Sequence, residues 1–195
     1  MSAAQRFSWK PALMGARYEV RADEAGVEAT RGSKTQKVRY ADVTGGRFLE
    51  IAMRTSSTSL VLLHRNGKFV INHGGLAREA AHSEDARGFV AACIAILEGL
   101  ATARPGAEIA MGGGAGIRWT MAILGVLMAG MGALLAIVPF AQGGVDGEGV
   151  MVVIMAIVIA LGGLGLAARY NPLRKPPAIK ATDLATALRT FLPQD

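Results

Sequence analysis

The chain has 195 residues, of which 51% are hydrophobic and 18% charged, with a formal net charge of +6 and a mean hydropathy of +0.34. Soluble domains carry about 25% charged residues, so an unusually apolar core or a membrane segment must account for the difference. The length excludes a large multidomain enzyme, the single Cys93 excludes an internal disulfide, and an aromatic content of 6% is too low for an aromatic-rich recognition surface.

The first part of the chain alternates between apolar and polar residues with the period of two that is typical of half-buried strands. Turn residues separate the segments, as at Arg31-Gly32-Ser33-Lys34 and at the Asn-Gly pair of Asn66 and Gly67. The predicted strands cover residues 17–21, 27–30, 36–40, 47–54, 60–64 and 69–72. The pattern predicts an antiparallel meander.

A helix is predicted to follow the strands. Ser83 is placed to cap it, and Glu84 and Asp85 suit the positive end of its dipole. Its apolar face consists of Phe89, Val90, Cys93, Ile94, Leu97 and Leu100. We expect this helix to close the sheet, so that residues 1–103 form one domain, and we expect the Pro- and Gly-rich residues 104–116 to form a flexible joint.

Two long apolar runs come next. Residues 119–140 and 150–168 contain no Asp, Glu, Lys, Arg or His, and a helix of about 20 residues spans the hydrocarbon layer of a bilayer. Neither run has the polar stripe that a helix with one wet face shows. The sequence therefore predicts transmembrane helices at 117–140 and 150–169 in preference to a pair of buried core helices.

The short, Gly-rich connector at 141–149 can join only antiparallel neighbours, so the two helices are predicted to form a hairpin. The connector contains Asp146 and Glu148 but no Lys or Arg. Basic residues flank the hairpin on both sides, namely Arg104, Arg118, Arg169, Arg174, Lys175 and Lys180. By the positive-inside rule, the connector is predicted to be periplasmic and both termini cytoplasmic.

Small residues recur along both apolar helices, at Gly125, Ala129 and Ala133 in the first and at Ala156 and Ala160 in the second. Such residues let helix backbones approach closely in lipid. The other helix of the hairpin is the nearest partner, and a membrane-protein partner is the alternative. Because no ionisable side chain lies within either run, the hairpin is predicted to anchor the chain and not to conduct ions or substrates.

The tail, residues 170–195, begins with a basic, Pro-rich exit and ends in a short amphipathic helix that Thr182 could cap. The apolar side of this helix consists of Leu184, Leu188, Phe191 and Leu192. A helix of about three turns is unstable alone in water, so we expect it to dock on the membrane interface, on the N-terminal domain or on another protein. The N-terminal domain is the simplest of these choices because it is a local partner.

Several short strands followed by one helix, together with the segment Lys37-Val38-Arg39-Tyr40-Ala41-Asp42-Val43, resemble the pleckstrin-homology-like (PH-like) domains of bacterial membrane proteins. The resemblance covers about residues 8–103 and is one of pattern, and many of those proteins place their membrane helices first. It implies a bent sheet or half-barrel plugged at one end by the helix, with a split α+β sandwich as the alternative. It also implies that an early hairpin forms a phosphate-binding mouth.

Within that hairpin, Arg31, Lys34 and Lys37 would contact anionic lipid headgroups, as the resemblance implies. The segment up to residue 80 is rich in Lys and Arg, and each basic residue near an anionic membrane surface contributes about 1 kcal/mol of attraction. A solvated face is the alternative, because basic residues also keep sheet edges from pairing.

Other chemistries have weak support in the sequence. The Gly32-Ser33-Lys34-Thr35 segment lacks the upstream glycine of a phosphate-binding loop. The three histidines and Cys93 lack the short spacing of structural zinc sites, and no nucleophile stands in a catalytic context. We predict no catalytic residue, metal or cofactor, and neither a nucleic-acid partner nor a small-molecule substrate.

The sequence thus predicts an α+β protein of the bacterial inner membrane. A PH-like domain closed by an amphipathic helix is followed by a two-helix transmembrane hairpin and a short amphipathic tail helix. Its expected function is that of a non-enzymatic interaction or scaffold module that presents a basic domain to a protein or to anionic lipid. An accessory subunit of a larger inner-membrane complex is the alternative.

Overall fold

The computed structural model describes residues 4–12, 15–51, 56–141 and 147–193 and divides into two compact units. The first unit contains Met1–Gly112 together with Pro176–Asp195, and the second contains Gly113–Lys175. The expected boundaries differ from this division, because they separate the tail, 170–195, from the N-terminal domain. The tail in fact completes that domain.

The first sheet consists of four antiparallel strands in the order β1-β2-β3-β4. The strands are β1 (Gln5–Trp9), β2 (Tyr18–Ala22), β3 (Gly26–Arg31) and β4 (Lys34–Arg39). In β2, the buried residues Tyr18, Val20 and Ala22 alternate with exposed Glu19 and Arg21, so one face of the sheet lies on the core. Strand β1 was missing from the sequence-based expectation.

The second sheet has the order β7-β6-β5-β8-β9. Its strands are β5 (Val43–Ile51), β6 (Ser57–His64), β7 (Gly67–His73), β8 (Glu108–Met111) and β9 (Ala178–Lys180). All pairs are antiparallel except β5 and β8, which run parallel. The short helix η1 (Tyr40–Asp42) leads from the first sheet to the second, and η2 (Ala77–Ala81) follows β7.

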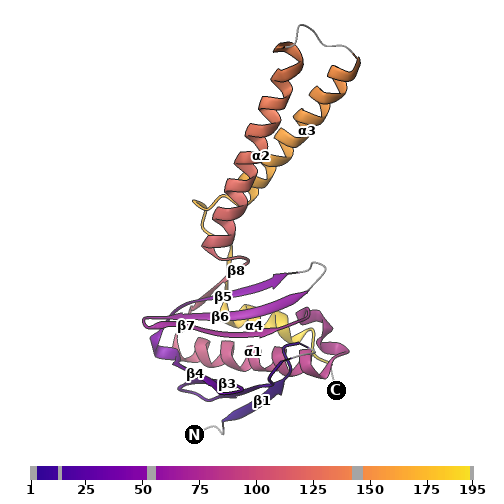
Figure 1. The fold of residues 1–195 in the computed structure, drawn as a ribbon. Helices are drawn as coiled ribbons and strands as arrows, with labels where there is room; N and C mark the ends of the chain where they lie inside the picture. The colour runs from indigo at the N-terminus through magenta and orange to yellow at the C-terminus, as the bar shows by residue number, and fades with distance from the viewer. Residues whose placement is uncertain (1–3, 13–14, 52–55, 142–146, 194–195) are drawn as a thin grey trace. The chain divides into compact units, whose positions relative to one another are not determined.

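Helix α1 (Glu84–Ala103) lies between the two sheets (Figure 1). The prediction that Ser83 caps it is confirmed, because the Ala86 backbone N–H donates to the Ser83 hydroxyl over 3.3 Å. The α1 residue Phe89 makes an edge contact with Trp9 of β1, with ring centroids 5.5 Å apart, and shares the core with Leu60 and Ile71 of the second sheet. Helix α1 therefore packs against both sheets.

Three α-helices in the described part of the chain are long and apolar enough to cross a membrane, namely α1, α2 (Ala115–Ala141) and α3 (Gly147–Arg169). Half of the apolar window of α1 is buried inside the protein, compared with 17% for α2 and 11% for α3. The apolar residues of α1 thus form a protein core, whereas those of α2 and α3 largely face outward. The fold is that of an α+β protein compatible with membrane insertion.

The segment 104–116, for which we expected a flexible joint, contains strand β8. Helix α2 extends to Ala141 with Pro139 inside it, and α3 begins at Gly147. Residues 142–146 of the expected connector lie outside the described residues.

The tail forms β9 and then α4 (Ala181–Arg189). Thr182 does not cap α4, because the helix begins one residue earlier, at Ala181, and Lys180 precedes it without a side-chain cap. The Ala181 N–H instead donates to the Ala107 carbonyl over 2.9 Å. Pairing with β8 therefore sets the start of this helix.

Candidate functional site

The β3–β4 hairpin brings Arg31 and Lys34 directly opposite each other at the ends of the two strands. Gly32 follows Arg31 with a φ of 59°, the left-handed conformation that a tight hairpin turn requires and that glycine adopts without strain. The turn places two basic side chains on the same face of the sheet. Among the described residues, neither has an ion-pair partner.

An aromatic stack positions Arg31. Its guanidinium lies 5.2 Å from the centre of the Tyr18 ring, which stacks on Trp9 with ring centroids 5.0 Å apart. The Tyr18 hydroxyl donates to Asn72 Oδ1, and Trp9 Nε1 donates to the Asn72 carbonyl, each over 3.0 Å. A cation over an aromatic ring gains about 0.5–1 kcal/mol at an exposed site, so Arg31 is held at the rim of a fixed core.

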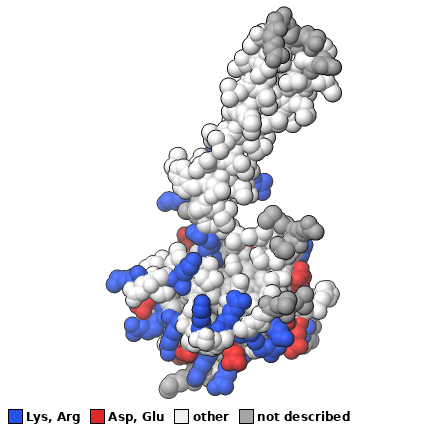
Figure 2. Space-filling view, in the orientation of Figure 1, with Lys and Arg blue, Asp and Glu red and all other residues white. Residues whose placement is uncertain are grey.

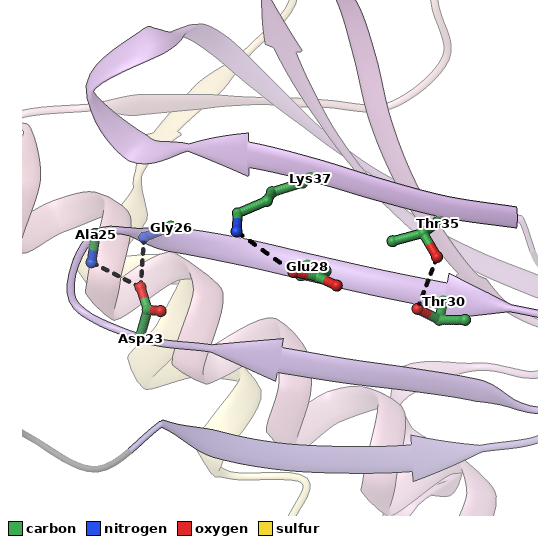
Figure 3. Close-up of polar contacts among 7 residues, drawn as sticks. All are labelled: Asp23, Ala25, Gly26, Glu28, Thr30, Thr35 and Lys37. Atoms are coloured by element: carbon green, nitrogen blue, oxygen red, sulfur yellow. Dashed lines mark hydrogen bonds and ion pairs between the residues drawn. The ribbon is translucent and has the colours of Figure 1, made fainter.

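Lys37 does not join this pair. It lies opposite Glu28 in the register, and its Nζ is 3.5 Å from Glu28 Oε2 (Figure 3). Successive side chains of a strand point to opposite faces, so Lys37 lies on the face away from Arg31 and Lys34. The three residues predicted to form one headgroup site are therefore split into a pair and a separate, ion-paired lysine.

The outer face of the first sheet carries charges of both signs. A shallow hollow there is lined by Arg6, Ser8, Glu19, Arg21, Glu28 and Thr30. Thr30 and Thr35 lie opposite each other, with 3.1 Å between their hydroxyl oxygens (Figure 3). Basic side chains in this unit are likewise interspersed with acidic ones on the face shown in Figure 2. The outer face is a balanced polar surface and not a basic patch.

Asp23 has a structural role in the turn that precedes β3. Its Oδ1 accepts the N–H groups of Ala25 and Gly26 over 2.9 and 2.8 Å (Figure 3). A Cβ added at Gly26 would lie 2.4 Å from the Val38 carbonyl oxygen. The turn therefore depends on a carboxylate and on a glycine at fixed positions.

The buried titratable groups do not form a reactive cluster. Burial raises the pKa of the Cys93 thiol and lowers the pKa of His73, which makes Cys93 a poor nucleophile. Within the described ranges, no group of three or more His, Cys, Asp or Glu side chains could hold a metal ion. The absence of a metal or cofactor role stays a prediction.

The second unit is held together by close packing of small residues. A Cβ at Gly125 would lie 2.6 Å from the Gly163 carbonyl oxygen, and a Cβ at Gly132 would lie 2.6 Å from the Ala156 carbonyl oxygen and from the Ala160 amide nitrogen. Backbones meet this closely only where side chains are absent or small.

Four of the five predicted packing residues lie along this contact. Gly125, Ala156 and Ala160 are among its close approaches, and a Cβ at Gly163 would lie 2.5 Å from the amide nitrogen of Ala129. Ala133 is exposed instead. The residues in contact on α2, Gly125, Ala129 and Gly132, are spaced by four and then three, as in left-handed helix pairs, and not by four throughout.

The tail helix is docked on the N-terminal unit. Leu184 and Leu188 are 4% and 2% exposed within the same core as α1, and Phe191 and Leu192 are partly buried against it. Arg189 of α4 also forms a salt bridge with Glu98 of α1. The tail helix therefore docks on the N-terminal domain, one of the three docking places that the sequence left open.

Compared with known proteins, the chain matches no family model, and a search of curated proteins finds no significant relative.

Proposed function

We propose that this chain is a non-enzymatic, membrane-anchored interaction module, whose globular unit resembles PH-like domains and is held at the cytoplasmic face of a bacterial inner membrane. The observation that carries the proposal is the pairing of β8 with β9. These strands lie on either side of α2 and α3 in the sequence. The apolar hairpin is thus an insertion in a domain that both flanking segments build.

The insertion constrains the topology. Because Glu108–Met111 and Ala178–Lys180 belong to one sheet, both ends of the hairpin must lie on the same side of a membrane that it enters. The basic residues near the hairpin ends, with none in the connector, favour the cytoplasmic side.

The proposed relation to PH-like domains rests on the order of elements alone. Four strands, three strands and then one helix follow each other along the chain, as the resemblance leads us to expect. The position of α1 between two sheets, and the added strands β8 and β9, are departures from a half-barrel plugged at one end.

Arg31 and Lys34 are the proposed contacts of the module with its partner. They are adjacent, lack ion-pair partners among the described residues, and project from a hairpin fixed by the Tyr18 and Trp9 stack. Two neighbouring cations suit a phosphate or carboxylate group. The partner is therefore an anionic lipid headgroup or an acidic segment of a protein.

A headgroup titration tests this contact. The full chain in phosphatidylcholine nanodiscs should bind soluble dihexanoyl phosphatidylglycerol, and Arg31→Glu with Lys34→Glu should weaken the affinity at least about tenfold, since each lost charge contact contributes about 1 kcal/mol or more. The exchange Glu28→Lys with Lys37→Glu keeps the net charge and should leave the affinity unchanged. Equal affinities for all three proteins would reject the pair as a lipid site, and binding of acidic peptides with the same variants would then be the deciding test for a protein partner.

An accessory subunit of a larger membrane complex is the second candidate. Gly130 on α2 and Gly162 and Gly165 on α3 have no atom within 4 Å of an added Cβ, so these glycines offer a close approach to a further helix. Affinity capture of the full chain from mildly solubilised membranes tests this function. A stoichiometric membrane partner that is lost with Gly162→Leu would support it, and a solitary protein would reject it.

A further inference from the structure

The two sheets differ in the chemistry of the faces that point away from α1. On the first sheet this face carries only polar side chains along its central rows, including Arg6, Glu19, Arg21, Glu28, Thr30 and Lys37. On the second sheet it carries Leu49, Ile51, Val61, Leu63 and Val70, here called the aliphatic face, beside the polar residues Ser57, Ser59 and Asn72. One unit therefore has one charged and one aliphatic outer surface.

The alternation of burial shows which way these residues point. Leu60, Leu62 and Ile71 are fully buried in the core, and the residues between them, Val61 and Val70, are partly exposed. Leu63 is 37% exposed. Val61 lies opposite Val70 on one side and Arg47 on the other, so the aliphatic face runs across three strands.

The α-helices described in this unit lie on the other side of the sheet. Phe89 of α1 and Leu188 of α4 share one core with Leu60 and Ile71, and Figure 1 shows α1 beneath β5, β6 and β7. Strands with aliphatic residues on both faces are typical of sheets that are covered on both sides. The aliphatic face thus needs a covering surface that these helices do not supply.

The charges around the aliphatic face are mainly basic. Arg47 lies in the same cross-strand row as Val61, and Lys68 lies opposite Leu63. Glu108 has the same orientation but lies opposite Lys180. Aliphatic side chains flanked by Lys and Arg are the composition that binds the interface of anionic membranes.

Chain connectivity keeps this sheet close to the membrane anchor. Strand β8, which pairs with β5, ends at Met111, and α2 begins at Ala115. Four extended residues span at most about 14 Å. The end of the second sheet is therefore within this reach of the first apolar helix, and the first sheet has no such direct connection.

We propose that the aliphatic face, Leu49, Ile51, Val61, Leu63 and Val70, lies against the anionic lipid leaflet in which the hairpin is anchored, with Arg47 and Lys68 on lipid phosphates. The proposal rests on the anchoring function proposed above. Its consequence is an orientation of the domain: the first sheet, on the far side of α1, faces the aqueous phase. Arg31 and Lys34 lie at the end of the β3–β4 hairpin on the side of the first sheet that points toward α1, and not on this outer face.

Site-specific fluorescence quenching tests this orientation in the full chain. A thiol-reactive fluorophore is attached at Leu63→Cys on the aliphatic face, or at Glu19→Cys on the outer face of the first sheet as the matched control. Cys93 is fully buried, so it does not compete for the label. In nanodiscs that contain phosphatidylglycerol and a headgroup-spin-labelled lipid, we expect at least threefold stronger quenching at position 63 than at position 19.

A third label position distinguishes failure of the proposed orientation from failure of the proposed membrane anchor. Leu127 on α2 is 63% exposed, and a label at Leu127→Cys should be quenched by an acyl-chain spin label. Quenching at 127 with equal quenching at 63 and 19 would overturn the orientation and leave the anchor standing. Absence of quenching at 127 would overturn the anchor itself.

Charge reversal tests whether Arg47 and Lys68 contribute to the proposed contact with lipid phosphates. Arg47→Glu with Lys68→Glu should reduce the quenching at position 63 at least twofold, whereas Arg6→Glu with Arg21→Glu on the first sheet should leave it unchanged. Equal effects of the two pairs would contradict a specific contact. A second copy of the chain or a protein covering the aliphatic face would shield position 63 from lipid, and that result would also overturn the proposal.

Discussion

Ile109 of β8 and Ile179 of β9 lie directly opposite each other in the second sheet, although both long apolar helices separate them in the sequence. The pair makes the globular unit depend on segments from both sides of the hairpin. Residues that follow the second apolar helix supply an edge strand and a helix to a domain that begins before the first one.

The first prediction is a disulfide cross-link between Ala110 and Ala178, the pair of positions next to Ile109 and Ile179. Met111 N–H donates to the Pro177 carbonyl and Ala181 N–H donates to the Ala107 carbonyl, so Ala110 and Ala178 form a non-hydrogen-bonded pair, in which Cα atoms are closest. Ala110→Cys with Ala178→Cys should form a disulfide on mild oxidation of the full chain, seen as a mobility shift on a non-reducing gel. Ala110→Cys with Leu173→Cys, whose native leucine is 84% exposed, is the control that should remain reduced.

The docked tail helix should contribute strongly to stability. Leu188 is 2% exposed against α1, and truncating a buried leucine to alanine costs about 2–5 kcal/mol. Leu188→Ala should lower the free energy of unfolding of the globular unit by this amount, measured by denaturant titration with fluorescence of the buried Trp9. Thr186→Ala, on the exposed side of the same helix, should change it far less. Equal effects would mean that the tail helix is not docked.

The packing of the hairpin predicts opposite outcomes at two nearby glycines. An added Cβ at Gly132 would lie 2.6 Å from backbone atoms of α3, whereas at Gly130 it would meet no atom within 4 Å. Gly132→Val should destabilise the helix pair by about 1–3 kcal/mol, as overpacking does, in a titration of the full chain from mild detergent into sodium dodecyl sulfate. Gly130→Val should be nearly neutral, and a larger effect at 130 would contradict this packing.

The lowered pKa of His73 predicts that the free energy of unfolding depends on pH. Burial lowers its pKa below the ordinary value of 6.5, outweighing the opposite influence of the Lys10 backbone, Asp85 and Glu79. As the pH falls through 6.5, the unfolded chain therefore binds more protons than the folded chain, and the free energy of unfolding falls with it.

His73→Gln should flatten this dependence in unfolding measurements between about pH 5 and 7. His82→Gln, at an exposed position, should leave it unchanged. A slope that survives His73→Gln would show that another group titrates.

Local sequence patterns predicted much of the fold. The Ser83 cap, the β3–β4 turn at Gly32 and the two apolar helices depend on residues close in the chain. Strands β8 and β9 were missed because Glu108–Met111 and Ala178–Lys180 are too short to show a period of two and become strands only by pairing with distant partners.

The candidate site was harder to predict because it depends on which way side chains point. Lys34 and Lys37 are close in the sequence, but an odd spacing places them on opposite faces of β4. In the hairpin, Ala133 fitted a spacing of four, whereas the spacing of helix pairs selects Gly132. The period of two in a strand separates Lys34 from Lys37. The spacing of four and three in a helix pair selects Gly132 in place of Ala133.

Removal of the hairpin tests most directly the central claim, that segments from both sides of the hairpin build one domain. Because Met111 and Pro177 are joined by a backbone hydrogen bond, an Asn-Gly turn can replace residues 112–176 and connect β8 to β9 as an ordinary hairpin. The account predicts a folded protein that unfolds in one cooperative transition, whereas residues 1–112 alone, without β9 and α4, should lack that transition. A cooperative, equally stable fold for residues 1–112 alone would contradict a domain built from both sides of the hairpin.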